Sequence, residues 1–210
     1  MAPPDSDGMQ ATRLAPLVLA ASCWSSAALA AGDAQTVAPT DTPTLAATAV
    51  SPLRPDAFFV QIGAGRDTSA SVVGANWHWQ WQREFAGGRL GGYWEASFGR
   101  WNARQAGDDS SAWITQIGLT PVLRYTSDTS ANRWFAELGI GANVILPLYR
   151  SRDRRFSTAF NFGDHVAVGW RWGAANEHEF ALRIQHFSNA GIKHPNPGAD
   201  FLQLRYTRAL

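Results

Sequence analysis

The chain has 210 residues, 17% of them charged, with 18 Lys and Arg against 17 Asp and Glu, one Cys, ten Trp and nineteen Gly. The near-equal charges show no basic excess of the kind that a nucleic-acid-binding protein needs. One Cys cannot build a disulfide scaffold. A helical membrane protein is also excluded, because a membrane helix needs a run of about 20 apolar residues that the sequence lacks. What remains is a Gly- and Trp-rich domain of low charge, either a secreted β protein or a membrane barrel.

Residues 1–30 are predicted to be an export signal that is removed. Arg13 precedes an apolar stretch, and small residues end the segment at Ala30, which is the order of a charged region, an apolar region and a cleavage site. A lipoprotein anchor at Cys23 is the alternative, although the usual leading Leu is absent. Cleavage after Ala30 would remove the only cysteine, so the exported fold is expected to form without disulfides.

Residues 31–56 are predicted to be a flexible linker because they are rich in Ala, Thr and Pro and lack a sustained period. Residues 57–210 then form the folded domain. The true start of translation stays open between Met1 and Met9, because acidic residues at positions 5 and 7 suit a signal badly.

The folded domain alternates apolar and polar residues with a period of two, which is the pattern of β-strands with one apolar face. The second face carries Gly, Asn, Gln and Ser, as expected for the cramped interior of a narrow barrel. Eight segments follow this pattern, at residues 58–65, 73–81, 90–99, 116–125, 134–143, 165–172, 180–185 and 202–210.

Aromatic residues at segment ends suit the interfacial belts of a membrane barrel. These are Trp81, Tyr125, Trp134 and Trp172. The sequence therefore predicts an all-β, eight-stranded antiparallel transmembrane barrel of the outer membrane, with a soluble secreted barrel or sandwich as the alternative.

The connections fit a barrel whose first strand runs outward from the periplasm, because outer-membrane barrels have longer outer loops than inner turns. Outer loops are predicted near 66–71, 103–111, 146–157 and 189–199, and inner turns near 83–88, 127–132 and 173–177.

The residues that carry chemistry lie around the last predicted outer loop. His186 and Ser188 share the strand face of the apolar residue Ile184, which the barrel model turns toward lipid. Ionisable groups on a lipid face are costly and indicate function. The alternative is that the strand ends at Ile184 and both residues are solvated in the loop. Pairing symmetric about the loop places Asp200 across from Ser188 and diagonal to His186.

These positions predict a hydrolase of the Ser-His-acid type. Ser188 is the expected nucleophile, His186 the general base and then acid, and Asp200 the group that orients the imidazole. Asn189, beside the nucleophile, is the expected oxyanion donor through its side-chain amide or its backbone N–H.

At these residues the sequence resembles the lipid A deacylases of the PagL type. The resemblance spans about residues 57–210 and is strongest at His186-Phe187-Ser188-Asn189-Ala190-Gly191, with further matches at Lys193, Pro195-Asn196, Gly92-Tyr93-Trp94-Glu95 and Asn161-Phe162. It implies an outer-membrane serine esterase that hydrolyses the ester-linked 3-hydroxyacyl chain at the 3-position of lipid A. His186, Ser188 and Asn189 match the family's catalytic pair and oxyanion donor, whereas Asp200 stands where the family has Glu.

Four arginines in a predicted outer loop are candidate ligands for lipopolysaccharide phosphates, although a solvated loop explains them equally well. They are Arg150, Arg152, Arg154 and Arg155. The predicted partners are lipopolysaccharide and outer-membrane lipid, with a homodimer left open, and hydrolysis by this triad needs no cofactor or metal. The rival function is a non-enzymatic small barrel that serves as a structural, adhesin or surface-recognition protein.

Overall fold

The computed structural model describes residues 53–107, 110–127 and 133–210, and the regular secondary structure within them is β-strand. The predicted signal at 1–30 and most of the predicted linker at 31–56 lie outside the described residues. No helix long and apolar enough to cross a membrane occurs in the described ranges. The strands are β1 (Ala57–Gly65), β2 (Thr68–His78), β3 (Arg83–Phe85), β4 (Gly88–Arg104), β5 (Ser111–Ser127), β6 (Trp134–Leu146), β7 (Phe160–Trp172), β8 (His178–Ser188) and β9 (Ala199–Ala209).

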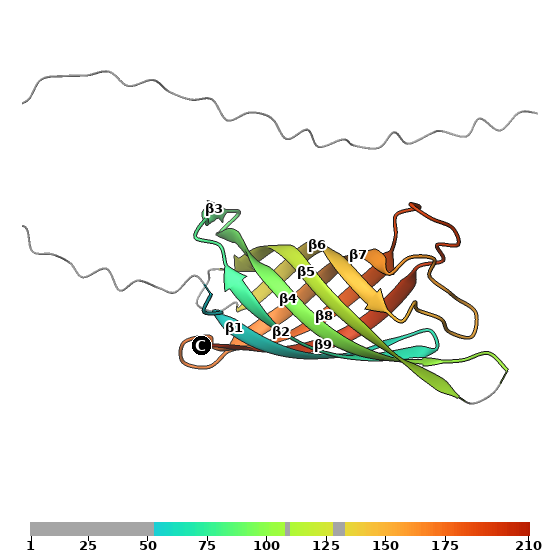
Figure 1. Cartoon of the computed structure of the whole chain (residues 1–210). Helices are drawn as coiled ribbons and strands as arrows, with labels where there is room; N and C mark the ends of the chain where they lie inside the picture. Colours follow the sequence, from blue (N-terminus) through green and yellow to red (C-terminus); the bar gives the residue numbers. More distant parts are fainter. Residues whose placement is uncertain (1–52, 108–109, 128–132) are drawn as a thin grey trace, which may run out of the picture. The chain divides into compact units, whose positions relative to one another are not determined.

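Eight of these strands close into one antiparallel barrel, which confirms the predicted fold class (Figure 1). Neighbours in the chain pair with one another, β2 pairs with β4 past the short β3, and β1 pairs with β9 to close the sheet. The connections between β4 and β5, β6 and β7, and β8 and β9 gather at one end of the barrel (Figure 1). Closure leaves no unpaired long edge, as a strand-built membrane protein requires.

The two faces of the strands differ as the alternation predicts. Ile62, Leu138 and Ile184 point outward and are 63%, 57% and 57% exposed, whereas Gln61 and Gln203 point inward and are 4% and 2% exposed. An exterior of large apolar side chains around a polar interior is the inverse of a soluble barrel. This arrangement is typical of a transmembrane barrel, whose outer wall contacts the lipid bilayer.

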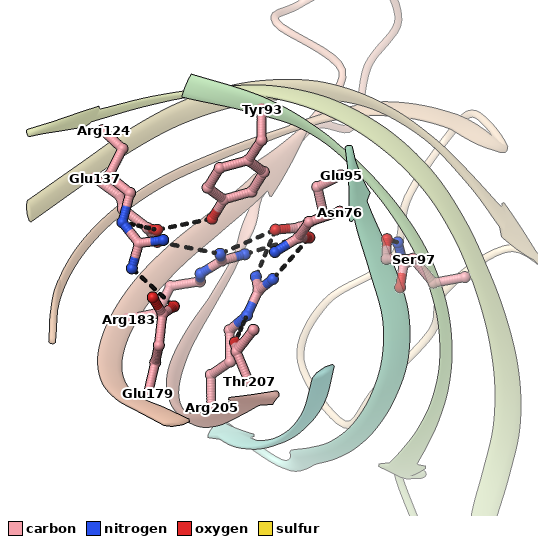
Figure 2. A network of polar contacts seen from close by, with 11 residues as sticks. Asn76, Tyr93, Glu95, Ser97, Arg124, Glu137, Glu179, Arg183, Arg205 and Thr207 are labelled. Carbon is pink, nitrogen blue, oxygen red and sulfur yellow. Dashed lines mark hydrogen bonds and ion pairs between the residues drawn. The ribbon is translucent and has the colours of Figure 1, made fainter. Parts of the chain in front are cut away.

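A network of buried charges crosses the barrel interior (Figure 2). The Glu95 carboxylate accepts two hydrogen bonds from Arg183, each 3.1 Å long, and a further one from Arg205. Arg183 also lies 3.7 Å from Glu137, whose carboxylate accepts a hydrogen bond of 2.8 Å from the Tyr93 hydroxyl. Each buried charge thus has a partner of opposite sign, which offsets the cost of taking it out of water. The inward pattern predicts a polar interior, but not these pairs.

At the end of the barrel with the long loops, the interior is apolar instead. Trp101 is 1% exposed, and its ring centroid lies 4.9 Å from those of both Phe187 and Phe201 and 5.8 Å from that of Tyr149. Tyr149 in turn packs on Phe156 at 4.8 Å. This cluster ties the β6–β7 loop, which carries Tyr149 and Phe156, to the ends of β8 and β9.

Two predicted connections are wrong. The loop expected at 66–71 is a turn of only Arg66 and Asp67, with Asp67 at φ 57°. The alternation failed there because the outward residues at the start of β2 are Ser69 and Ser71, which look polar in sequence. The turn expected at 83–88 contains β3, which pairs with the start of β4 through a hairpin at Ala86 and Gly87, both with positive φ.

Candidate active site

The predicted catalytic residues lie on the outer face of β8 and β9, at their loop ends. His186 and Ser188 flank Phe187, which is 2% exposed and packs inward against Trp101. Asp200 precedes Phe201, which is also 2% exposed and joins the same cluster. Because successive strand residues face opposite sides, burying the two phenylalanines turns His186, Ser188 and Asp200 outward. Both His186 and Ser188 belong to β8, so the alternative that the strand ends at Ile184 is wrong.

His186 and Asp200 form a hydrogen-bonded pair. The imidazole Nδ1 lies 2.6 Å from Asp200 Oδ1, and the two side chains are 41% and 65% exposed. A carboxylate only accepts hydrogen bonds, so Nδ1 carries the proton and leaves Nε2 free to accept one. The expected register is wrong in detail, because Asp200 lies directly opposite His186 and not opposite Ser188. A direct cross-strand position brings the side chains closest, which explains how Asp reaches the imidazole although it is shorter than Glu.

Ser188 is the last residue of β8 and pairs with Phe162 of β7. Its side chain is half-buried, and within the described part of the chain its hydroxyl forms no hydrogen bond, to His186 or to any other group. Ser188 therefore lies two residues from His186 on the same face, with a hydroxyl that is not committed to holding the fold.

Two further residues hold the His186–Asp200 pair: Gly198, which no sequence pattern indicates, and Arg154, which the sequence predicts only as a phosphate ligand. Arg154 Nη1 lies 3.7 Å from Asp200 Oδ2 and donates a hydrogen bond of 3.0 Å to the Gly198 carbonyl. Gly198 adopts φ +67° and packs so closely on His186 that a Cβ there would lie 2.5 Å from the imidazole Cε1. Nothing in the sequence separates Arg154 from its neighbouring arginines, because an irregular loop has no period.

Asn189 is 1% exposed and holds the β8–β9 loop together. Its side-chain amide donates to the Lys193 carbonyl at 2.7 Å and to the Ser157 hydroxyl at 3.0 Å, and its backbone N–H donates to Asn196 Oδ1 at 3.0 Å. Both donors expected to face an oxyanion are thus engaged within the loops. The oxyanion role of Asn189 stays a prediction, and the contacts that it forms are structural.

The four arginines of the β6–β7 loop do not act as one group. Arg150, Arg152 and Arg155 are exposed, whereas Arg154 is 25% exposed and turns toward Asp200. Among the described residues, no group of three or more His, Cys, Asp and Glu side chains is placed to hold a metal ion.

A closed barrel with an apolar exterior defines an integral membrane barrel, and the histidine–carboxylate pair beside a serine makes its outer wall a candidate hydrolytic site. Comparison with known proteins narrows the class. The family model described as lipid A 3-O-deacylase (PagL) matches residues 70–208. The lipid A deacylase PagL of Bordetella bronchiseptica is 39% identical over 60% of this chain and 68% of its own length. That of Pseudomonas aeruginosa is 32% identical over 69% of this chain and 81% of its own length.

A solved structure agrees with the sequence matches. The crystal structure of the outer membrane enzyme PagL superposes with a TM-score of 0.65 at 28% identity, and covers 73% of this chain and 99% of the solved chain. The chain belongs to the PagL family of lipid A 3-O-deacylases and is an outer-membrane enzyme. The non-enzymatic alternative is thereby overturned.

Proposed function

We propose that this enzyme removes the ester-linked 3-hydroxyacyl chain at the 3-position of lipid A, with Ser188 as nucleophile, on the lipid-facing wall of the barrel. Membership in the deacylase family supports lipid A as the substrate. The observation that carries the mechanism is the 2.6 Å contact between His186 and Asp200 on the apolar exterior, two residues from Ser188. A site on the outer wall meets a membrane lipid without extracting it from the bilayer.

In the acylation step, Ser188 Oγ attacks the ester carbonyl carbon while His186 Nε2 takes the hydroxyl proton. Asp200 accepts the hydrogen bond from Nδ1 and stabilises the imidazolium that forms. The tetrahedral intermediate then collapses, the bond from the carbonyl carbon to the sugar oxygen breaks, and His186 returns the proton to that oxygen. The products are the acyl-enzyme on Ser188 and lipid A with a free 3-hydroxyl.

In the deacylation step, a water attacks the acyl-enzyme as His186 removes its proton. Collapse of the second intermediate breaks the bond to Ser188 Oγ, which regains its proton from His186, and releases a 3-hydroxy fatty acid. For Asn189 to stabilise either oxyanion, its backbone N–H would have to exchange Asn196 Oδ1 for the substrate oxygen.

The exposed arginines of the β6–β7 loop support binding of the lipid A phosphates. Guanidinium groups form paired hydrogen bonds with phosphate oxygens. Three of these groups are exposed to solvent, those of Arg150, Arg152 and Arg155. Arg154 has a different role, because it contacts Asp200 and Gly198. Removal of the exposed arginines is expected to weaken binding more than the chemical step.

The mechanism is tested with purified barrels in detergent and lipopolysaccharide as substrate. Ser188→Ala and His186→Asn are expected to fold but to release no 3-hydroxy fatty acid by mass spectrometry. Ser71→Ala is the matched control, because Ser71 is an exposed serine of β2 outside the site, and it should keep full activity. Full deacylation by Ser188→Ala would show that another group is the nucleophile.

A further inference from the structure

A second carboxylate lies beside His186 and has no part in the mechanism above. Asp164 of β7 pairs directly with His186 of β8, which in turn pairs with Asp200 of β9. The three side chains form one row across three neighbouring strands, with the imidazole between two carboxylates. Only Asp200 is hydrogen bonded to the ring. Asp164 is exposed on the barrel exterior.

Asp164 and His186 line one end of an apolar groove of about 360 Å³ on the outer wall of β6, β7 and β8. Its walls are the aliphatic side chains of Leu138, Ile140, Val166 and Ile184. Asp164 also lies opposite Ile140 in the pairing of β6 with β7, so an aliphatic residue stands on one side of the carboxylate and the imidazole on the other.

A carboxylate on the lipid-facing wall is costly, and such groups are kept for function. An ion pair does not explain the presence of Asp164 on this wall, because within the described ranges no cationic side chain lies within salt-bridge distance of its carboxylate. The groove needs an occupant that is aliphatic along most of its length and carries a hydrogen-bond donor close to the atom attacked by Ser188.

The acyl chain of the proposed substrate meets both requirements. We infer that the groove holds the chain being cleaved and that Asp164 accepts a hydrogen bond from the 3-hydroxyl of that chain, an inference that rests on the proposed function. The hydroxyl is on the third carbon of the chain, two carbons from the ester carbonyl, so it must lie near His186 when the ester is at Ser188. A carboxylate only accepts hydrogen bonds and therefore suits a hydroxyl donor. Asp164 is then a specificity-determining residue for 3-hydroxylated chains.

The test uses two synthetic esters of phosphorylated glucosamine in mixed micelles. One carries a 3-hydroxyacyl chain at the 3-position, and the other carries an unhydroxylated chain of equal length. A hydrogen bond to a charged group predicts that the wild-type enzyme prefers the hydroxylated ester by about 10- to 100-fold in kcat/KM. Asp164→Leu should bring this ratio close to one, and Asp164→Asn should give an intermediate ratio because the amide oxygen accepts without charge.

Asp67→Asn is the matched control, since it removes a carboxylate at the β1–β2 turn, outside the groove, where φ is 57° and Asn is tolerated. It should keep the wild-type ratio. A preference that survives in Asp164→Leu overturns the inference, and so does an equal loss on both esters, which would mean that Asp164 acts on His186. If the wild-type enzyme cleaves both esters equally, the inference about Asp164 is wrong and the proposed function stands. If the wild-type enzyme cleaves neither ester, the proposed function fails and the inference fails with it.

Discussion

Substitution of Gly198 by Ala displaces the His186 ring without replacing any residue of the proposed catalytic set. The added Cβ would lie 2.5 Å from the imidazole Cε1 and 3.1 Å from Nε2. Ordinary contact begins near 3.4 Å, so the ring or the loop must move by about 0.9 Å. A misplacement of about 1 Å at a catalytic contact costs about 100-fold in rate, which corresponds to about 2.7 kcal/mol of transition-state stabilisation.

Gly191→Ala separates this effect from backbone strain. Gly191 lies in the same loop at φ +81°, against +67° at Gly198, but a Cβ there meets nothing within 4 Å. Both variants bear a similar strain of about 1–2 kcal/mol for an L-residue in the left-handed region. They differ in the contact with His186.

The assay is kcat and KM for release of 3-hydroxy fatty acid, with heat-dependent migration in gels as the check on folding. Gly198→Ala should lose about 100-fold in kcat with a small change in KM, and Gly191→Ala should stay near the wild type. If the two variants lose activity equally, loop strain and not the position of the imidazole limits the rate, and the reasoning is refuted.

Three other changes test the site and its support. Asp200→Glu adds a methylene where the contact with His186 is already 2.6 Å, so kcat/KM should fall about 10- to 100-fold; an increase would show that the register suits the longer acid. Arg154→Gln removes the cation beside Asp200 and should lower kcat about 3- to 10-fold with KM little changed, whereas a rise in KM alone would assign Arg154 to substrate phosphate. Glu95→Gln removes the carboxylate that pairs with both Arg183 and Arg205, two buried arginines, and should destabilise the barrel by about 3–5 kcal/mol in urea titration; a loss under 1 kcal/mol would contradict the importance of the network.

Much of the fold was predicted from the alternation of apolar and polar residues, because a strand turns successive side chains to opposite faces whatever its neighbouring strands are. It placed Leu138 and Ile184 outward and Gln203 inward, as the structure has them. It failed where outward residues are small and polar, as at Ser69 in the first half of β2.

The alternation could not predict which charged residues pair with one another inside the barrel. Glu95 meets Arg183 across 88 residues and Arg205 across 110, and these partners depend on closure of the whole barrel. A charge at an inward position predicts that a partner exists, but it does not say on which strand.

The outward face shared by His186, Ser188 and Asp200 was determined by the sequence alone, since parity within a strand is a local property. The tertiary structure decided that Asp200 stands opposite His186, because register depends on how the β8–β9 loop and the Trp101 cluster fix two strands against each other. It also decided that Gly198 and Arg154 hold the pair and that Asp164 completes the row. These contacts join loops and strands distant in the chain, and only packing brings such groups together.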